Sequence, residues 1–327
     1  MFGYRMGFVM VSTVILLLSA SLMFSAETWR LGQQGELKAV SAEGEDKYLL
    51  AVAQIKKLVN TGQTEAVGKA LDKLKKDFPE IAGPDLDAFI KAEMLFSKGK
   101  FTKAVRGYDK FLKEYSESAL FEAALDRQSA IATAFLAGRK RPILKVFKIK
   151  GYATGVRIME KISDRAGLDA PIGVKAAIAV AENYEKRERF HEAYLKWEEI
   201  GFQWETGEIG RDALLGQARC KHAVYRGPKY DASNLTGPFG AKNYYEKFKL
   251  RYPEDAEELE VDKILEQIEQ QLAYKQFSIG EYYQKMGNKR SANLYYDMVI
   301  GDWPDSKAAE MAKKTMNENL DSEKIKK

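Results

Sequence analysis

The amino-acid sequence predicts an all-α protein, a superhelical solenoid of about six helical hairpins. Three observations support this fold class. The 327 residues include only 8 prolines, aromatic residues make up 11 % of the chain, and one spacing of small, aromatic and apolar residues recurs along it. Few prolines permit long helices, and aromatic rings fill the space between them. A recurring unit is typical of stacked hairpins rather than of a single closed core.

The amino terminus has the pattern of an export signal. Residues 1–26 contain one charge, Arg5, followed by an apolar run from about Gly7 to Phe24. The small residue Ala26 suits cleavage after it, whereas an uncleaved run would be long enough for a single membrane anchor. A buried helix of a cytosolic protein fits less well, because the run is apolar on every face. We expect an exported chain in the periplasm or cell envelope, with a flexible tether at residues 27–47 and a charged tail at residues 321–327.

One column of residues organises the rest of the chain. A small residue is followed four positions on by an aromatic one, three further on by an apolar one and four further on by another aromatic one. The clear copies are Ala104, Tyr108, Phe111 and Tyr115; Ala193, Trp197, Ile200 and Trp204; Ala241, Tyr245, Phe248 and Tyr252; and Ala292, Tyr296, Val299 and Trp303. Looser copies are Val67, Leu71, Leu74 and Phe78, and Gly155, Met159, Ile162 and Ala166. These steps place each set on one helix face, which predicts a buried stripe.

A partner helix precedes each column. Gly62, Gly99 and Gly287 each stand five residues before the small residue that opens a column, where a left-handed glycine ends a helix. Before Gly287, the segment Ala273–Met286 has the pattern of a first helix, with Gly280 as its close-packing residue. Each unit is therefore predicted to be a helix, a tight turn and a second helix, in about 34 residues.

This hairpin resembles the tetratricopeptide repeat, and the resemblance covers residues 48–320. Within that class, Phe277–Asn288 together with the closing segments Tyr252–Asp255 and Trp303–Ser306 is similar to the BamD family, the repeat subunit of the machinery that assembles outer-membrane β-barrels. Members usually carry a lipobox cysteine at the end of the export signal, where this chain has Phe24–Glu27. The resemblance implies a periplasmic scaffold that binds the barrel-assembly subunit and unfolded segments of outer-membrane proteins.

The inventory of reactive residues does not indicate an enzyme. The chain has two histidines, His191 and His222, and one cysteine, Cys220, without a ligand-like or base-like neighbour. Basic and acidic residues, 52 and 47, are interspersed, which does not favour nucleic-acid binding. We therefore expect no catalytic residue, cofactor or metal. Two alternatives stay open, an envelope organiser of the Tol-Pal or peptidoglycan type and, more remotely, a hydrolase with an unrecognised site.

Function should then lie on the groove that the first helices of stacked hairpins line. Aligning the columns predicts which residues face it: Phe89, Glu93, Phe96, Gln128, Phe135, Lys175, Ile178, Glu182, Tyr274, Phe277, Glu281 and Gln284. Mixed aromatic and charged residues suit an extended peptide. The alternative is that about half of these residues belong to the core between repeats.

Two units carry insertions between their helices. The first, Gly138–Lys150, contains no acid, and its basic residues Arg139, Lys140, Arg141, Lys145, Lys148 and Lys150 alternate with apolar ones. It is a possible docking loop for an acidic partner or an anionic membrane face. Alternatively, it is an extra amphipathic turn whose apolar residues pack on the solenoid. The second, Tyr225–Gly240, is predicted to be a turn-rich loop.

Overall fold

A computed structural model describes residues 28–31, 37–40, 42–61, 63–79, 83–143 and 147–325. The expected export signal at residues 1–26, Gly62 and the end of the charged tail lie outside these residues. The chain divides into two compact units, one ending at Lys98 and the other spanning Gly99–Lys327. In the described part of both units, no helix is long and apolar enough to cross a membrane.

The first unit contains three helices and a short strand pair. Helices α1 (Ala42–Asn60) and α2 (Thr64–Asp77) form a hairpin, and α3 (Pro84–Ser97) packs on both. The segment expected to be a flexible tether, 27–47, contains strands β1 (Thr28–Leu31) and β2 (Leu37–Val40), which pair antiparallel, and the first residues of α1.

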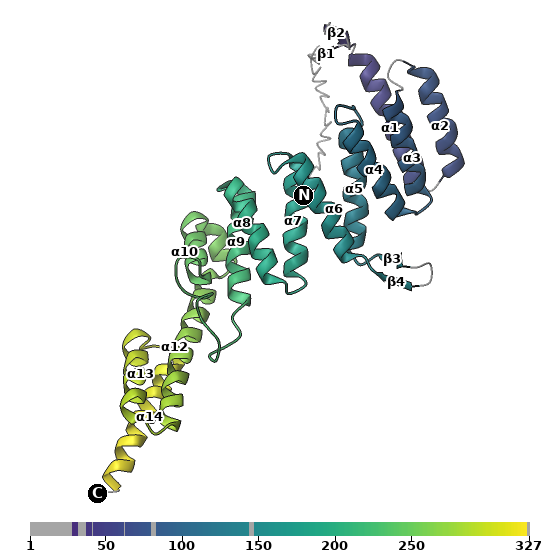
Figure 1. The fold of residues 1–327 in the computed structure, drawn as a ribbon. Coiled ribbons are helices and arrows are strands. Elements are labelled where there is room, and N and C mark those ends of the chain that lie inside the picture. Colours follow the sequence, from purple (N-terminus) through teal and green to yellow (C-terminus); the bar gives the residue numbers. More distant parts are fainter. Residues whose placement is uncertain are drawn as a thin grey trace, which may run out of the picture. The chain divides into compact units, whose positions relative to one another are not determined.

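The second unit is a succession of antiparallel helices, each packed against the next (Figure 1). Its helices are α4 (Phe101–Glu114), α5 (Phe121–Leu136), α6 (Tyr152–Ala166), α7 (Pro171–Glu185), α8 (Phe190–Gln203), α9 (Gly207–Ala223), α10 (Ala241–Arg251), α11 (Pro253–Glu258), α12 (Val261–Lys285), α13 (Lys289–Asp302) and α14 (Lys307–Ile325). Hairpins are formed by α5 with α6, α7 with α8, α9 with α10 and α12 with α13, and α14 packs on the last of these. The sixth expected hairpin, α3 with α4, is divided between the two units.

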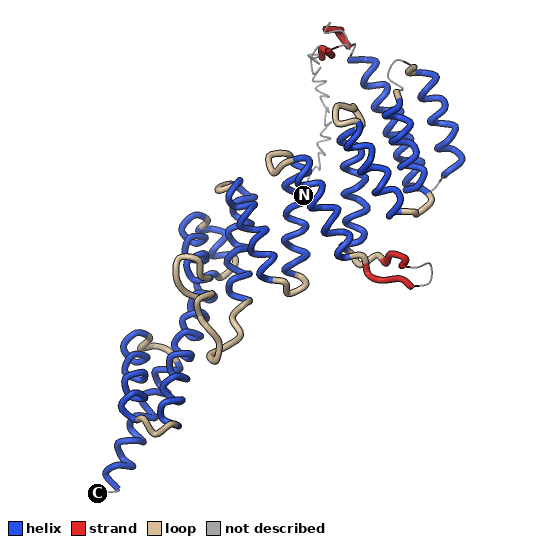
Figure 2. The backbone as a smooth tube through the Cα atoms, viewed as in Figure 1, coloured by secondary structure: helices blue, strands red, loops and turns tan. Residues whose placement is uncertain are grey.

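We call the first helix of each hairpin an A helix and the second, which carries the column, a B helix. The buried stripe predicted for the B helices is confirmed. In the second unit the first three members of every column are buried, from Ala104, Tyr108 and Phe111 in α4 to Ala292, Tyr296 and Val299 in α13. The described part of the chain is therefore nearly all helix, and the predicted all-α, tetratricopeptide-type solenoid is confirmed (Figure 2).

Two glycines of the A helices leave room for rings of the B helices. A Cβ atom built on Gly216 of α9 would lie 2.5 Å from the ring of Trp197 in α8, and one on Gly280 of α12 would lie 2.5 Å from the ring of Tyr296 in α13. Side chains essentially never approach this closely. The absence of a Cβ atom therefore lets each ring lie directly against the backbone of an A helix.

The turns within hairpins follow the predicted geometry. Gly99 and Gly287 have φ values of 65° and 76°, in the left-handed region. Glu188 stands at the equivalent place before Ala193, and its φ of 58° shows that this hairpin makes the same turn without glycine. A side chain in this conformation crowds its own backbone, which makes Glu188 a strained position.

Two predicted elements differ in the structure. The first helix of the last hairpin starts at Val261 rather than Ala273, because Val261 and Ile268 join the core of α7–α10 before Ala273 and Phe277 enter the core shared with α13 and α14. One continuous helix thus serves two cores.

The basic insertion is a β-hairpin rather than an amphipathic turn. Strands β3 (Lys140–Ile143) and β4 (Phe147–Lys150) pair antiparallel, with Lys140 opposite Lys150 and Ile143 opposite Phe147. Apolar and basic residues alternate with period two in β4, Phe147–Lys150, and that period suits a strand. The predicted loop at Tyr225–Gly240 has no helix or strand, and its Leu235 is buried in the core of α7–α10.

Candidate protein-binding surface

Five of the residues predicted to face the groove do not line an open surface. Phe89, Glu93, Gln128, Phe135 and Phe277 are buried, with exposed fractions of 3 % or less. The prediction is wrong for these five because an A helix packs against more than one neighbour, so spacing alone does not distinguish its contact faces from its free face. Lys175, Glu182 and Tyr274 are exposed, and Phe96, Ile178, Glu281 and Gln284 are partly exposed. The groove role of these seven stays a prediction.

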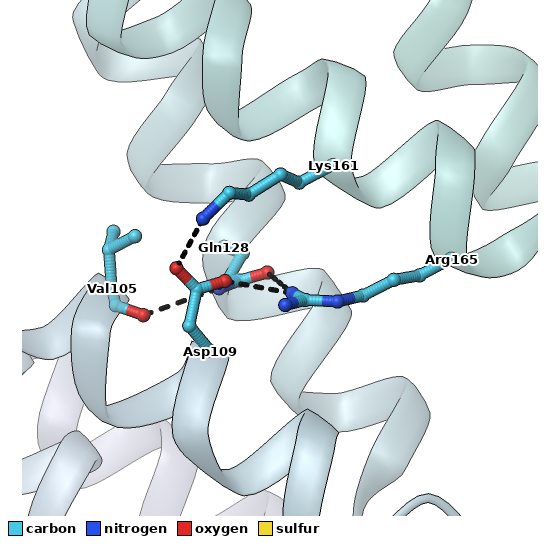
Figure 3. A network of polar contacts seen from close by, with 5 residues as sticks. All are labelled: Val105, Asp109, Gln128, Lys161 and Arg165. Atoms are coloured by element: carbon cyan, nitrogen blue, oxygen red, sulfur yellow. Dashed lines mark hydrogen bonds and ion pairs between the residues drawn. The ribbon is translucent and has the colours of Figure 1, made fainter.

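A network of polar contacts explains the burial of Gln128 (Figure 3). The Gln128 amide in α5 donates to Oδ1 of Asp109 in α4 at 3.0 Å and to the carbonyl oxygen of Val105 at 3.4 Å. From α6, Lys161 Nζ lies 2.9 Å from Asp109 Oδ2, and Arg165 Nη1 lies 2.8 Å from Oδ1. This Asp109 network therefore joins three consecutive helices, and Gln128 is engaged in holding them together.

The Asp109 carboxylate is stabilised in its charged form. Burial alone would raise its pKa, but the hydrogen bonds from Lys161, Gln128 and Arg165 outweigh burial, and the pKa is lowered below the ordinary 3.8. At neutral pH the network thus holds one ionised carboxylate between two cations.

Polar side chains also link three consecutive A helices. Arg219 of α9 donates to Glu185 of α7 through Nε at 3.1 Å and Nη2 at 2.9 Å. His222 Nε2 of α9 lies 3.2 Å from Gln271 Oε1 of α12. Glu185 also accepts a hydrogen bond from the indole of Trp197 in the B helix α8. We call the surface that α7, α9 and α12 share along these contacts the A-helix surface.

The charges on the A-helix surface influence one another. Burial raises the pKa of Glu182, the neighbouring charges of Glu185 and Asp212 raise it further, and Arg219 acts in the opposite direction. Burial also lowers the pKa of His222, so its imidazole is neutral near neutral pH. The surface therefore presents carboxylates and one strongly basic guanidinium.

A cavity of 270 Å³ opens on this surface between α9, the loop that follows α9, α10 and α12. Its lining residues are Arg219, His222, Ala223, Tyr225, Tyr245 and Gln271. The buried Tyr225 hydroxyl has no hydrogen-bond partner in the described part of the chain. The volume lies just below the roughly 300–1,000 Å³ typical of small-molecule sites. Its size suits one inserted side chain.

Sequence reasoning missed the residues that make this surface continuous. Glu185, Arg219 and Gln271 are ordinary polar residues on charged helices, and no motif sets them apart. Cys220 is buried, and burial raises the pKa of its thiol to about 12. Such a thiol is inert.

The described residues contain no group of three or more His, Cys, Asp or Glu side chains placed to hold a metal ion. His191 is exposed at the start of α8, and His222 is partly buried in the last turn of α9, as expected for helix-end residues.

The structure places part of the predicted basic docking loop. Arg139 and Lys140 are exposed at the start of the β3–β4 hairpin. Arg141 and Lys148 belong to its strands, but their side chains lie outside the described part of the structure, as does Lys145 altogether. The docking role of these residues stays a prediction.

Comparisons with known proteins agree with the geometry of the last hairpin. Residues 276–306, from the middle of α12 to the turn after α13, match the tetratricopeptide repeat family model. Among curated protein sequences, none matches this chain.

Two solved structures are similar at low identity. The C-terminal part of a tetratricopeptide repeat-containing protein from Cytophaga hutchinsonii is 15 % identical, with a TM-score of 0.37 over 81 % of this chain and 87 % of the other. PilW, a type IV pilus biogenesis factor, is 16 % identical, with a TM-score of 0.29 over 83 % and 99 %. Scores this low do not bear on fold or function. What identifies the architecture is the matched hairpin and the copies of its column in the other helices: residues 276–306 are a tetratricopeptide repeat within an all-α solenoid of that type.

Proposed function

We propose that this chain is an exported, non-enzymatic scaffold that binds extended protein segments on its A-helix surface. In this proposal it works in the cell envelope, in a BamD-like role in the assembly of outer-membrane β-barrels. Its partners there are the barrel-forming assembly subunit and unfolded segments of outer-membrane proteins.

The observation that carries the binding role is the continuity of the A-helix surface. The rings of the B-helix columns are buried in the core, whereas α7, α9 and α12 present carboxylates, a guanidinium and an amide side by side. An extended segment has unpaired backbone donors and acceptors that such groups satisfy. Tyr274 on α12, with 43 % of its surface exposed, offers ring contact of the kind that anchors peptides.

Two features support the envelope role. The segments Phe277–Asn288 and Trp303–Ser306, which resemble the BamD family, coincide with the part of the chain that matches the tetratricopeptide model. The apolar run at the amino terminus has the composition of an export signal. Neither feature identifies the binding partner, so the experiment is designed to identify it.

The test is affinity capture from envelope extracts with the full-length chain. We compare the wild type with the double variant Glu182→Lys, Tyr274→Ala, and with Phe202→Ala as the matched control. Phe202 lies on the B helix α8 and is 87 % exposed, so its loss removes an apolar contact away from the A-helix surface. Circular dichroism checks that all three proteins are folded.

We expect the wild type and Phe202→Ala to recover a barrel-assembly component, and the double variant to recover at least about tenfold less, a change of about 1.4 kcal/mol in binding. Recovery without any barrel-assembly component would overturn the envelope role. Recovery of envelope-constriction proteins instead would favour the Tol-Pal type of organiser.

A further inference from the structure

Exposed basic residues gather at one end of the helices α4 to α8. Consecutive helices are antiparallel, so the first turns of α4, the connection between α5 and α6 and the turn between α7 and α8 lie at the same edge of the unit. We call this the basic edge. Its exposed cations are Lys100, Lys103, Arg106, Arg139, Lys140, Lys150 and Arg187. In Figure 1 the β3–β4 hairpin of this edge extends beyond the ends of α5 and α6.

These cations have no carboxylate partner in the described part of the chain. The segment from residue 137 to residue 157 contains no Asp or Glu. The opposite edge, formed by the turns between hairpins, is rich in exposed acids: Glu114, Glu117, Glu122, Asp164, Asp169, Glu205 and Glu208. The basic edge, which also contains the exposed Glu188, therefore has an excess of positive charge, and the opposite edge, which also contains Lys113, has an excess of negative charge.

Helix electrostatics accounts for only part of this pattern. Cations stabilise the C-terminal end of a helix, and Arg139 and Arg187 follow the C-terminal ends of α5 and α7. They are unfavourable at the N-terminal end, yet Lys100 and Lys103 stand at the N-terminal end of α4, and neither α4 nor α6 has an acidic residue in its first turn. At α4 the basic edge is thus maintained against local helix electrostatics.

The basic edge also has apolar surface between its charges. A cavity of 390 Å³ lies between the first turns of α4, the end of α5 and the start of β3, with Phe101 and Phe135 among its lining residues. The Arg139 guanidinium lies 4.7 Å from the centre of the Phe101 ring. Ile149 on β4 is 42 % exposed. A binding partner that offers both negative charge and apolar groups would suit this combination of cations and apolar side chains.

Two cations of the basic edge lie near the ring of Tyr152, at the start of α6. The Arg187 guanidinium lies 3.1 Å and the Lys150 ammonium 5.6 Å from the centre of this ring. The bond to Arg187, and then Lys150, lowers the pKa of the Tyr152 hydroxyl, although the side chain is exposed. Cations from β4 and from the α7–α8 turn thus meet at this ring.

We infer that the basic edge docks on the surface of an anionic bilayer, with the exposed Ile149 at the headgroup level and the acidic edge turned away. The inference rests on the proposed function only in that an exported envelope protein meets such a bilayer. A bilayer fits better than an acidic protein for two reasons. The cations are distributed over three successive turns with an exposed aliphatic side chain among them, as at membrane interfaces. The chain's own apolar run at residues 7–24 would also hold it near a bilayer.

The test is co-sedimentation of the full-length protein with vesicles of phosphatidylcholine alone or mixed with phosphatidylglycerol. The edge variant carries Lys103→Gln, Arg106→Gln, Lys140→Gln and Lys150→Gln. The control variant carries Lys113→Gln, Lys175→Gln, Lys307→Gln and Lys313→Gln, four exposed lysines elsewhere in the same unit. Both variants have the same net charge and the same apolar run, so any contribution of that run is common to all arms.

We expect the wild type and the control variant to prefer anionic vesicles, and raising the salt to about 0.5 M to remove the preference. Each cation near an anionic surface changes partitioning roughly fivefold, so the edge variant should lose the preference by at least tenfold. Equal partitioning of the edge and control variants would overturn the inference. So would binding of polyglutamate that the edge substitutions abolish while vesicle binding is unchanged, since that result would assign the edge to an acidic protein.

A second measurement reports orientation. Single cysteines replace Ile149 on the basic edge or Glu208 on the acidic edge and carry an environment-sensitive fluorophore; Cys220 is buried and does not compete for the label. We expect a blue shift on anionic vesicles at position 149 alone. Shifts at both positions, or at 208 alone, would contradict the orientation. Because only purified protein and lipid are used, failure to find a barrel-assembly partner would leave this result unaffected.

Discussion

The A and B helices of one hairpin are built on different principles. The B helix α8 buries the large side chains Trp197 and Ile200, whereas the A helix α9 buries Gly210, Ala213, Gly216 and Ala218. The contrast is weaker between α13, with Tyr296, and α12, which buries Phe277 besides Ala273 and Gly280.

In the α8–α9 pair, the Trp197 ring of the B helix fills the space beside Gly216, so the A helix contributes mainly small residues at that contact. Other A helices do bury large rings, Phe135 in α5 and Phe277 in α12. The remaining positions of the A helices are available for polar groups such as Glu182, Arg219 and Gln271. The proposed function assigns recognition to these positions.

The largest expected effect is the loss of a B-helix ring. Trp197→Ala should destabilise the protein by about 3–5 kcal/mol, because the buried indole fills the space beside Gly216 and donates to Glu185. Denaturant unfolding measures this change. Phe202→Ala on the same helix should stay within about 0.5 kcal/mol, because Phe202 is exposed. Similar losses for both would contradict a stability concentrated in the column.

The next largest effect is expected at Gly216 of α9, where the absence of a Cβ atom leaves room for the Trp197 ring. Gly216→Ala should destabilise by about 1–3 kcal/mol, because the new Cβ atom would meet the Trp197 ring. Gly68→Ala is the matched control: it lies inside α2 with no atom near the new Cβ, so better helix propensity should stabilise by about 0.5–1 kcal/mol. The signs are opposite. If both substitutions stabilise the protein in thermal unfolding, the Trp197 ring does not require a glycine at position 216.

The polar contact between α4, α5 and α6 should have a pH-dependent effect. Asp109→Asn is expected to cost about 1–2 kcal/mol at neutral pH, because two charge-assisted bonds are lost. The pKa of Asp109 is lowered in the folded state, so this stability is present above the ordinary 3.8 and is lost as the pH falls through the folded value below it.

Urea unfolding of wild type and variant at several pH values measures the gap between them. It should be constant above about pH 5 and close under more acidic conditions. The exposed Asp164→Asn, on α6, is the control and should show little effect at any pH. A gap of the same size at pH values on both sides of 3.8 would show that the charge of Asp109 is not what stabilises the three helices.

The smallest expected effect is a gain at the turn between α7 and α8. Glu188→Gly should stabilise by about 1 kcal/mol, because glycine adopts the left-handed conformation without the strain of a side chain. Glu188→Ala keeps the Cβ atom and should change stability by only a few tenths of a kcal/mol. An equal gain for both variants in thermal unfolding would trace the effect to the charge of Glu188 instead.

The B-helix half of the fold was predictable because its signal is redundant. Ala104, Tyr108 and Phe111 repeat in type and spacing in four clear copies, and each copy buries the same face. The A helices carry no such signal. Gln128 and Phe277 are spaced like groove residues, yet the first bonds to Asp109 and the second packs on Tyr296 at a ring-centre distance of 5.3 Å.

The contacts of the candidate surface depend on residues far apart in the sequence. Glu185 and Arg219 are brought together only by the stacking of α7 and α9, and the basic edge only by the alternation of helix direction along α4–α8. The β3–β4 hairpin was missed because its alternation of basic and apolar residues was attributed to a helical turn. Period two in Phe147–Lys150 was the signal that could have identified β4, whereas β3 has no such alternation.

The central claim, that the A helices bind and the B helices hold the fold, is tested most directly by photo-crosslinking in intact cells. A photoreactive phenylalanine analogue replaces Glu182 or Tyr274 on A helices, and Phe202 or Leu294 at exposed positions on B helices. We predict protein adducts from the two A-helix positions and none, or far fewer, from the two B-helix positions. Adducts of equal yield from both sets, or from the B-helix positions alone, would contradict the claim.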